Sequence, residues 1–202
     1  MAAEAALRAG DLAMPQTRST PRFAQTPCQR YLLAARHRPM PPRHHVRICK
    51  YDPASRDEAG RYLPDEWTAF SDIGTSFEGV VLTRAAYQQV EDAYVDSALA
   101  CLTEAGIAWL EVRDLEHRHP DVQVFEEGDR LDHAQLAPAL RAVLREQAWC
   151  AFETDHAYVH VGWDYYMYVG TPRPCPGSIA AAEARGLFVE STDGSPYSDR
   201  RR

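Results

Sequence analysis

The stretch of this chain that most constrains its fold is residues 157–170, in which apolar side chains alternate with polar and aromatic ones. Successive side chains of a β-strand point to opposite faces of the sheet. One extended strand here therefore predicts an apolar face turned to a core and a second face turned to solvent or a partner. The apolar set is Ala157, Val159, Val161, Trp163, Tyr165, Met167 and Val169, and the opposite set is Tyr158, His160, Gly162, Asp164, Tyr166 and Tyr168.

A hairpin partner for this strand lies directly before it, at residues 149–154. The connection, Asp155-His156, consists of two residues that tolerate turn conformations. Closing the hairpin there places Phe152 opposite Val159 and brings the apolar faces of both strands to the same side. The predicted register is therefore self-consistent.

The second face of the hairpin gains Trp149, which this register places opposite Gly162. An alternative turn at residues 162–163 is less favoured, because it moves Asp164 to the apolar side. A bulge at Gly162 is also open, since the strand is long and a bulge reverses the parity of the residues that follow it.

Two further segments predict helices. Thr83 is a suitable N-cap for a helix that ends before Gly106, and Asp132 with Gln135 forms a capping box for a second helix. Glu91 lies outside the apolar stripe of the first helix. Short strands are predicted at 46–51, 80–82, 107–112, 122–125 and 187–190, and a short helix at 178–185. Together these elements predict an α+β fold: a largely antiparallel sheet, two long helices packed on one face and a short C-terminal helix.

The chain of 202 residues is long enough for one domain with a tail. Residues 1–45 are rich in proline and poor in apolar periodicity, which predicts a disordered tail. A single domain is expected over residues 46–197 and a loose C-terminus over 198–202. Met40 is a second possible start of translation, which would make the preceding residues an annotation artefact; an organelle transit peptide is a less favoured interpretation of the tail.

Charge is divided unequally along the chain. Residues 1–47 hold eight arginines and two acidic residues, a net charge of +6, whereas the rest holds 14 basic and 27 acidic residues, a net charge of −13. An acidic body argues against a nucleic-acid partner and favours a basic protein partner. No run reaches the roughly 18 to 20 apolar residues that span a bilayer, so we expect no membrane partner and a cytoplasmic location.

Two groups of residues are candidate binding sites. The first is the polar face of the predicted hairpin, where aromatic rings surround a histidine and a carboxylate. It comprises Tyr158, His160, Asp164, Tyr166, Tyr168 and Trp149. A solvated face, a binding surface and a catalytic base with its carboxylate are the open interpretations, although a regular strand holds His160 and Asp164 too far apart to touch. The second group is an acidic and aromatic loop that contains Asp65, Glu66, Trp67 and Asp72.

Signatures of catalysis and of cofactor binding are weak. The histidines at 117, 119, 133, 156 and 160 match no known metal spacing, so no metal or other cofactor is expected. The five cysteines form no C-x-x-C pair, and Gly-x-Ser-x-Gly and phosphate-binding glycine loops are absent. Cys175 is the best nucleophile candidate, because it precedes a helix whose start can lower the pKa of a thiol; a packed loop thiol is the favoured alternative.

Several motifs resemble a known pattern: D-E-W-T-A-F-S-D-I-G at 65–74, V-E-D-A-Y-V at 90–95, G-W-D-Y-Y-M-Y-V-G at 162–170 and G-L-F-V-E at 186–190. They are similar to a family of small bacterial cytosolic proteins of unassigned function, over about residues 47–197. The resemblance implies an autonomous domain and transfers no catalytic residue.

The sequence therefore predicts a protein-binding module, of which an acidic immunity- or antitoxin-like inhibitor of a basic toxin is one form. Tyrosine and tryptophan on a polar face suit interface anchors. The first alternative is a small hydrolase or transferase that uses the Tyr/His/Asp strand face. The second is a structural module that forms a homo-oligomer through the tyrosine face.

Overall fold

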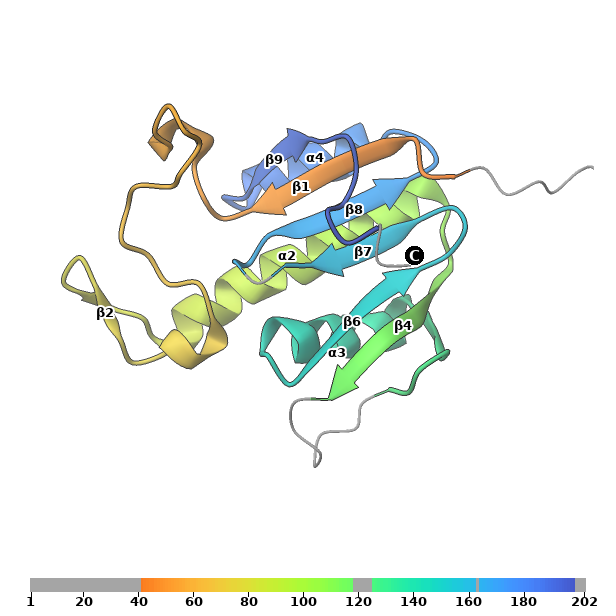
Figure 1. Ribbon diagram of the computed structural model, residues 1–202, viewed down its shortest axis with the longest axis horizontal. Helices are drawn as coiled ribbons and strands as arrows, with labels where there is room; N and C mark the ends of the chain where they lie inside the picture. The colour runs from red at the N-terminus through yellow and green to blue at the C-terminus, as the bar shows by residue number, and fades with distance from the viewer. Residues whose placement is uncertain (1–40, 118–124, 163, 199–202) are drawn as a thin grey trace, which may run out of the picture. The chain divides into compact units, whose positions relative to one another are not determined.

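The computed structural model of this chain describes residues 41–117, 125–162 and 164–198. Most of the predicted tail, the histidine at 119 and nearly all of the strand predicted at 122–125 lie outside these residues. The described part is an α+β structure with a large antiparallel sheet and three helices (Figure 1).

Seven strands form the main sheet, in the order β5-β4-β6-β7-β8-β1-β9, and every neighbouring pair is antiparallel. Their bounds are β1 (His44–Cys49), β4 (Trp109–His117), β5 (Arg130–Asp132), β6 (Ala148–Glu153), β7 (Tyr158–Val161), β8 (Met167–Thr171) and β9 (Phe188–Ser191). A separate ribbon pairs β2 (Ser76–Phe77) with β3 (Val80–Val81), and single 3-10 turns occur at Pro53–Ser55 and Phe70–Asp72.

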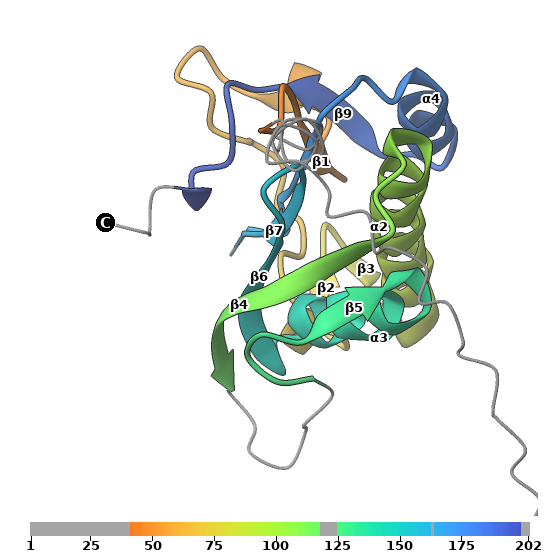
Figure 2. The same ribbon diagram turned by 90° about the vertical axis from the view of Figure 1, so that its right-hand side faces the viewer.

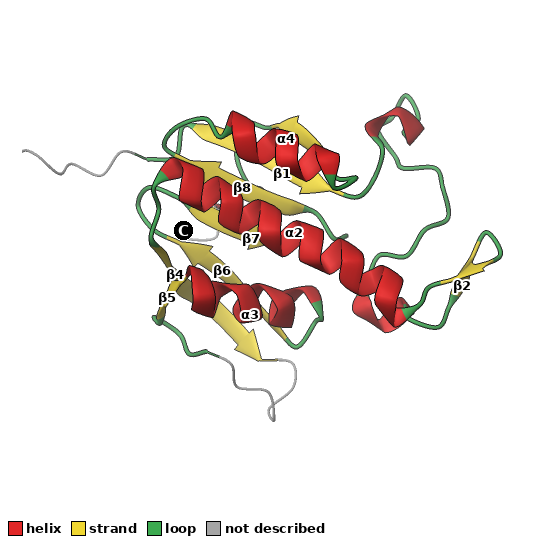
Figure 3. Ribbon diagram, turned by 180° about the vertical axis from the view of Figure 1, so that it is seen from behind, coloured by secondary structure: helices red, strands yellow, loops and turns green. Residues whose placement is uncertain are grey.

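The helices are α2 (Arg84–Ala105), α3 (His133–Leu144) and α4 (Pro176–Ala184). Thr83 caps α2, Gly106 ends it with a φ of 75°, and Asp132 with Gln135 forms the predicted capping box of α3. Edge-on and rear views place the helices on the same side of the sheet (Figures 2 and 3). The expectation of two long helices is not confirmed, because α2 has 22 residues but α3 only 12.

The predicted register of the first hairpin is confirmed for residues 151–153 and 158–160. Phe152 lies opposite Val159, Ala151 opposite His160 and Glu153 opposite Tyr158. Thr154 N–H donates to the Ala157 carbonyl at 2.8 Å and closes the turn.

The prediction of one strand over 157–170 is wrong, because the chain turns back after Val161 and forms a second hairpin. Gly162 N–H donates to the Tyr166 carbonyl at 2.7 Å, and Tyr165 has a left-handed φ of 60°. Burial of Tyr165, which is only 3 % exposed, offsets the strain of that conformation. Val161 pairs with Met167, so the alternation of faces survives the turn.

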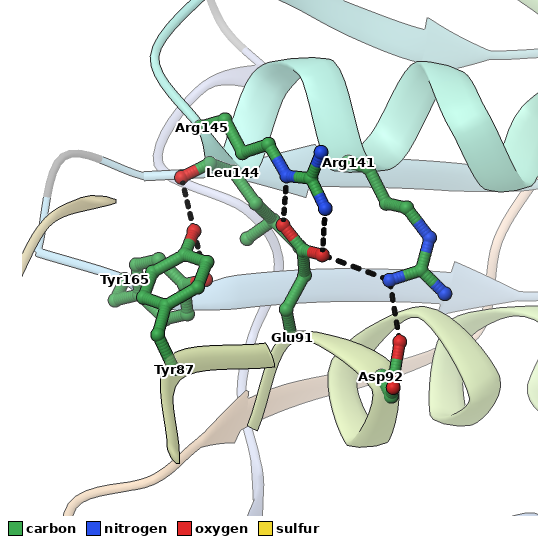
Figure 4. A network of polar contacts seen from close by, with 7 residues as sticks. All are labelled: Tyr87, Glu91, Asp92, Arg141, Leu144, Arg145 and Tyr165. Atoms are coloured by element: carbon green, nitrogen blue, oxygen red, sulfur yellow. Dashed lines mark hydrogen bonds and ion pairs between the residues drawn. The ribbon is translucent and has the colours of Figure 1, made fainter. Parts of the chain in front are cut away.

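A buried polar network joins α2 to α3 (Figure 4). Glu91 of α2 is 0 % exposed and accepts hydrogen bonds from Arg141 at 2.9 Å and from two nitrogens of Arg145 at 2.7 Å each. Beside it, the Tyr165 hydroxyl donates to Tyr87, whose own hydroxyl donates to the carbonyl of residue 144. The position of Glu91 outside the apolar stripe of α2 gave no sign of this burial.

Candidate functional site

Four candidate residues of the hairpin lie on the face of the sheet opposite the helices, called the outer face below: Trp149, Tyr158, His160 and Tyr168. Residues 192–198, called the strap, follow β9 and cross this face in front of β7 and β8 (Figure 1). The edge-on view shows the strap and the helices on opposite sides of the sheet (Figure 2). The centre of the outer face is therefore covered by the chain's own C-terminal part.

His160 is the centre of a polar relay beneath the strap. Its Nε2 lies 2.8 Å from Glu153 Oε1 on β6, and its Nδ1 lies 2.8 Å from Ser195 Oγ on the strap. The imidazole is 2 % exposed, and burial lowers the pKa of His160 to about 4. The ring is therefore neutral at pH 7. Because a carboxylate only accepts, Nε2 carries the proton and Nδ1 accepts from the Ser195 hydroxyl.

Aromatic rings enclose this relay. Tyr158 stacks on His160 with ring centres 4.5 Å apart, and its hydroxyl lies 2.8 Å from Nδ1 of His45. Tyr197 of the strap lies edge-on to Trp149 and Tyr168, at 6.2 and 6.1 Å between ring centres. The outer face is thus packed by rings as well as by hydrogen bonds.

Gly170 of β8 provides the space for Tyr158. A Cβ at position 170 would lie 2.2 Å from the Tyr158 ring, so Gly170→Ala must displace that ring. We expect the substitution to lower the free energy of unfolding by about 1–3 kcal/mol, measured by urea denaturation. Combining it with Tyr158→Ala removes the clash, and the double variant is expected to lose less than the sum of the two single losses. Additive losses would contradict this packing.

The carboxylate partner of His160 is Glu153 rather than Asp164. Asp164 lies exposed in the turn between β7 and β8, and Glu153 is the carboxylate that contacts His160. Sequence reasoning missed Glu153, although the correct register had placed it opposite Tyr158 and so diagonal to His160. Tyr166 is not part of the relay. Its ring contacts Tyr51 and lies 4.8 Å from the guanidinium carbon of Arg47.

The acidic loop is mostly occupied by internal contacts. Glu66 pairs with Lys50 Nζ at 2.5 Å, and the ring of Trp67 lies 4.2 Å from the same nitrogen. Asp72 accepts from the backbone N–H groups of residues 68 and 69, whereas Asp65 is exposed. Burial lowers the pKa of Lys50, the single lysine of the chain, to about 8.

The other candidates for chemistry are separated from this face. Cys175 precedes α4, but burial raises the pKa of its thiol, and Glu104 accepts from the first backbone N–H groups of that helix. His133 lies against the carbonyl of residue 107. Across the described ranges, no group of histidine, cysteine and acidic residues is arranged to hold a metal ion. The side chains at 117 and 119 lie outside the described residues.

A serine, a histidine and a glutamate linked by hydrogen bonds also form the catalytic triad of some hydrolases. Two features argue against that chemistry here. Ser195 is 9 % exposed and accepts from the Tyr197 N–H, and a histidine with a pKa near 4 is a weak base at neutral pH. The relay instead attaches the strap to the sheet.

No family model, curated protein or solved structure matches this chain. Within the described part of the chain, no helix is both long and apolar enough to cross a membrane.

One part of the outer face is hollowed beside the relay. This hollow, of about 350 Å³, is lined by Pro42, His45, Glu153, Thr154, Asp155, Tyr158 and Ser198. It combines two carboxylates with a tyrosine ring, and Asp155 is exposed at its rim. Such a lining suits a cationic group, because carboxylates accept its hydrogen bonds and a ring supplies a contact surface.

Proposed function

We propose that this chain is a protein-binding module that recognises a basic partner, with the hollow beside Tyr158 receiving an arginine or lysine side chain. The observation that carries the proposal is a pair of carboxylates that line the hollow. Glu153 and Asp155 flank Thr154 at the turn of the hairpin formed by β6 and β7. A hairpin in a seven-stranded sheet holds its end in a fixed geometry, which reduces the entropy lost on binding.

Net charge supports the same kind of partner. The body beyond residue 47 has a net charge of −13, which attracts a basic surface over long distances and raises its rate of association. An immunity- or antitoxin-like inhibitor of a basic toxin is the form of this function that we favour. We place the module in the cytoplasm; the free thiols of the four described cysteines are in keeping with a reducing compartment.

The two alternatives require the strap to move. A hydrolase or transferase that used His160 would need Ser195 and its imidazole to become accessible, and an oligomer built on the tyrosine face would need residues 192–198 to leave that face. The hollow is open without either change.

The proposal is tested with an immobilised nine-residue oligo-arginine peptide as the basic probe. Asp155→Asn is expected to weaken its binding at least fivefold, measured by biolayer interferometry at physiological ionic strength. Asp96→Asn, an exposed aspartate on α2, makes the same change in net charge and is expected to leave affinity within twofold. Equal weakening by the two variants would show general charge attraction and overturn the assignment of the hollow.

A further inference from the structure

A second cavity, of about 260 Å³, lies between the sheet and the helices α2 and α4. It opens where β1 begins and β8 ends. Its lining is contributed by Arg43, His44, His45, Val46, Cys101, Val169, Thr171, Pro174, Cys175, Ile179, Ser191 and Thr192. These residues come from three adjacent strands, from two helices and from the segments that flank them, so most of the wall is held by the packing of the fold.

The lining changes in character from the interior to the opening. Val46, Val169 and Ile179 provide apolar walls, with Cys101 and Cys175 between them. Both thiols are buried, and Cys175 Sγ donates to the Cys101 carbonyl at 3.3 Å. The hydroxyl groups of Thr171, Ser191 and Thr192 also line the cavity, so its walls are only partly apolar.

The opening is formed by residues that precede the acidic body. Arg43 and His44 both line the cavity and both are exposed. The backbone N–H of Arg43 donates to the Thr171 carbonyl at 2.9 Å, which holds the backbone at this position. None of the acidic side chains in the described ranges forms an ion pair with Arg43 or His44. A cation without a counter-charge at the mouth of a partly apolar cavity favours an anion with an apolar tail there.

We infer that this cavity binds a small organic carboxylate with a short apolar tail. The carboxylate contacts Arg43, whose planar guanidinium suits bidentate contact, with His44 beside it. The tail lies between Val46 and Ile179 and extends toward Cys175. At about 260 Å³ the cavity is below the usual range of roughly 300–1,000 Å³ for drug-sized ligands, so the ligand is a small metabolite.

The test titrates straight-chain carboxylates from butyrate to decanoate into the full-length protein, followed by isothermal calorimetry and thermal shift. The result expected is saturable binding with an optimum chain length, at least tenfold tighter than binding of the alcohol of the same length. Phosphate monoesters of the same alcohols distinguish a general anion site from a carboxylate site. Absence of saturable binding at every length, or equal binding of the alcohols, overturns the inference.

Two variants test the contact with the carboxylate and the contact with the apolar tail separately. Arg43→Ala with His44→Ala alters only exposed side chains and is expected to weaken the best carboxylate at least tenfold, whereas Arg61→Ala, at an exposed arginine elsewhere, is expected to have no effect. Ile179→Trp fills the cavity and is expected to abolish binding in a protein whose circular dichroism is unchanged. Full affinity in the Arg43 and His44 variant contradicts the proposal even if Ile179→Trp fails to fold.

Discussion

Glu91→Gln is expected to lower the free energy of unfolding by about 3 kcal/mol, the typical loss when one partner of a buried ion pair is removed. The carboxylate is fully buried and is the shared acceptor for the guanidinium groups of Arg141 and Arg145. Glutamine keeps the shape but leaves two cations facing a neutral amide. For a domain of this size the loss corresponds to a decrease in Tm of about 6–12 °C, measured by calorimetry.

Asp92→Asn is the matched control for this prediction. Asp92 also pairs with Arg141, but its side chain is about half exposed, so its removal is expected to cost less than about 1 kcal/mol. If Glu91→Gln destabilised the protein no more than Asp92→Asn, the network in Figure 4 would not hold α2 to α3 in the way described.

Acidification is expected to remove about 3 kcal/mol of stability through His160 alone. Burial lowers the pKa of His160 from 6.5 to about 4, so the folded protein holds this ring neutral while the unfolded chain protonates it. Stability is therefore constant with respect to this group above pH 6.5 and falls as the pH decreases from 6.5 to 4. Urea denaturation at pH intervals across that window measures the slope.

His160→Gln is expected to flatten this slope, although the variant is less stable at pH 7 because the bonds to Glu153 and Ser195 change. A carboxylate acts at lower pH: Arg56 and Arg47 hold the pKa of Glu190 at about 2, below its usual 4.5, so its contribution is lost only as the pH falls from 4.5 toward 2. A wild-type slope in His160→Gln would refute the assignment.

Local patterns predicted the elements whose signals are local. The capping box at Asp132, the N-cap at Thr83 and the register of the first hairpin depend on neighbouring residues and on alternation alone, and the structure shows all three. The α+β class followed from the order of these elements.

The remaining features depend on tertiary packing. The turn after Val161 is stabilised because Tyr165 bonds to Tyr87 and Tyr94 of α2. These partners are distant in sequence, so the residues near the turn do not predict it. Glu91 is buried because α3 brings two arginines to it from about 50 positions further along the chain. The relay of His160 depends on Ser195, which reaches the outer face only after β9 has joined the sheet.

The sheet order has a consequence for folding during synthesis. β1 is the first strand of the sheet to leave the ribosome, yet its neighbours are β8 and β9, the last two to be made. Contacts so distant in sequence form slowly. Until they form, β1 is an unpaired strand, and side chains that the folded sheet buries, such as Ile48, are exposed to other chains. We expect a nascent chain that pauses before β8 to depend on chaperones, whereas one released with β9 completes its sheet unaided.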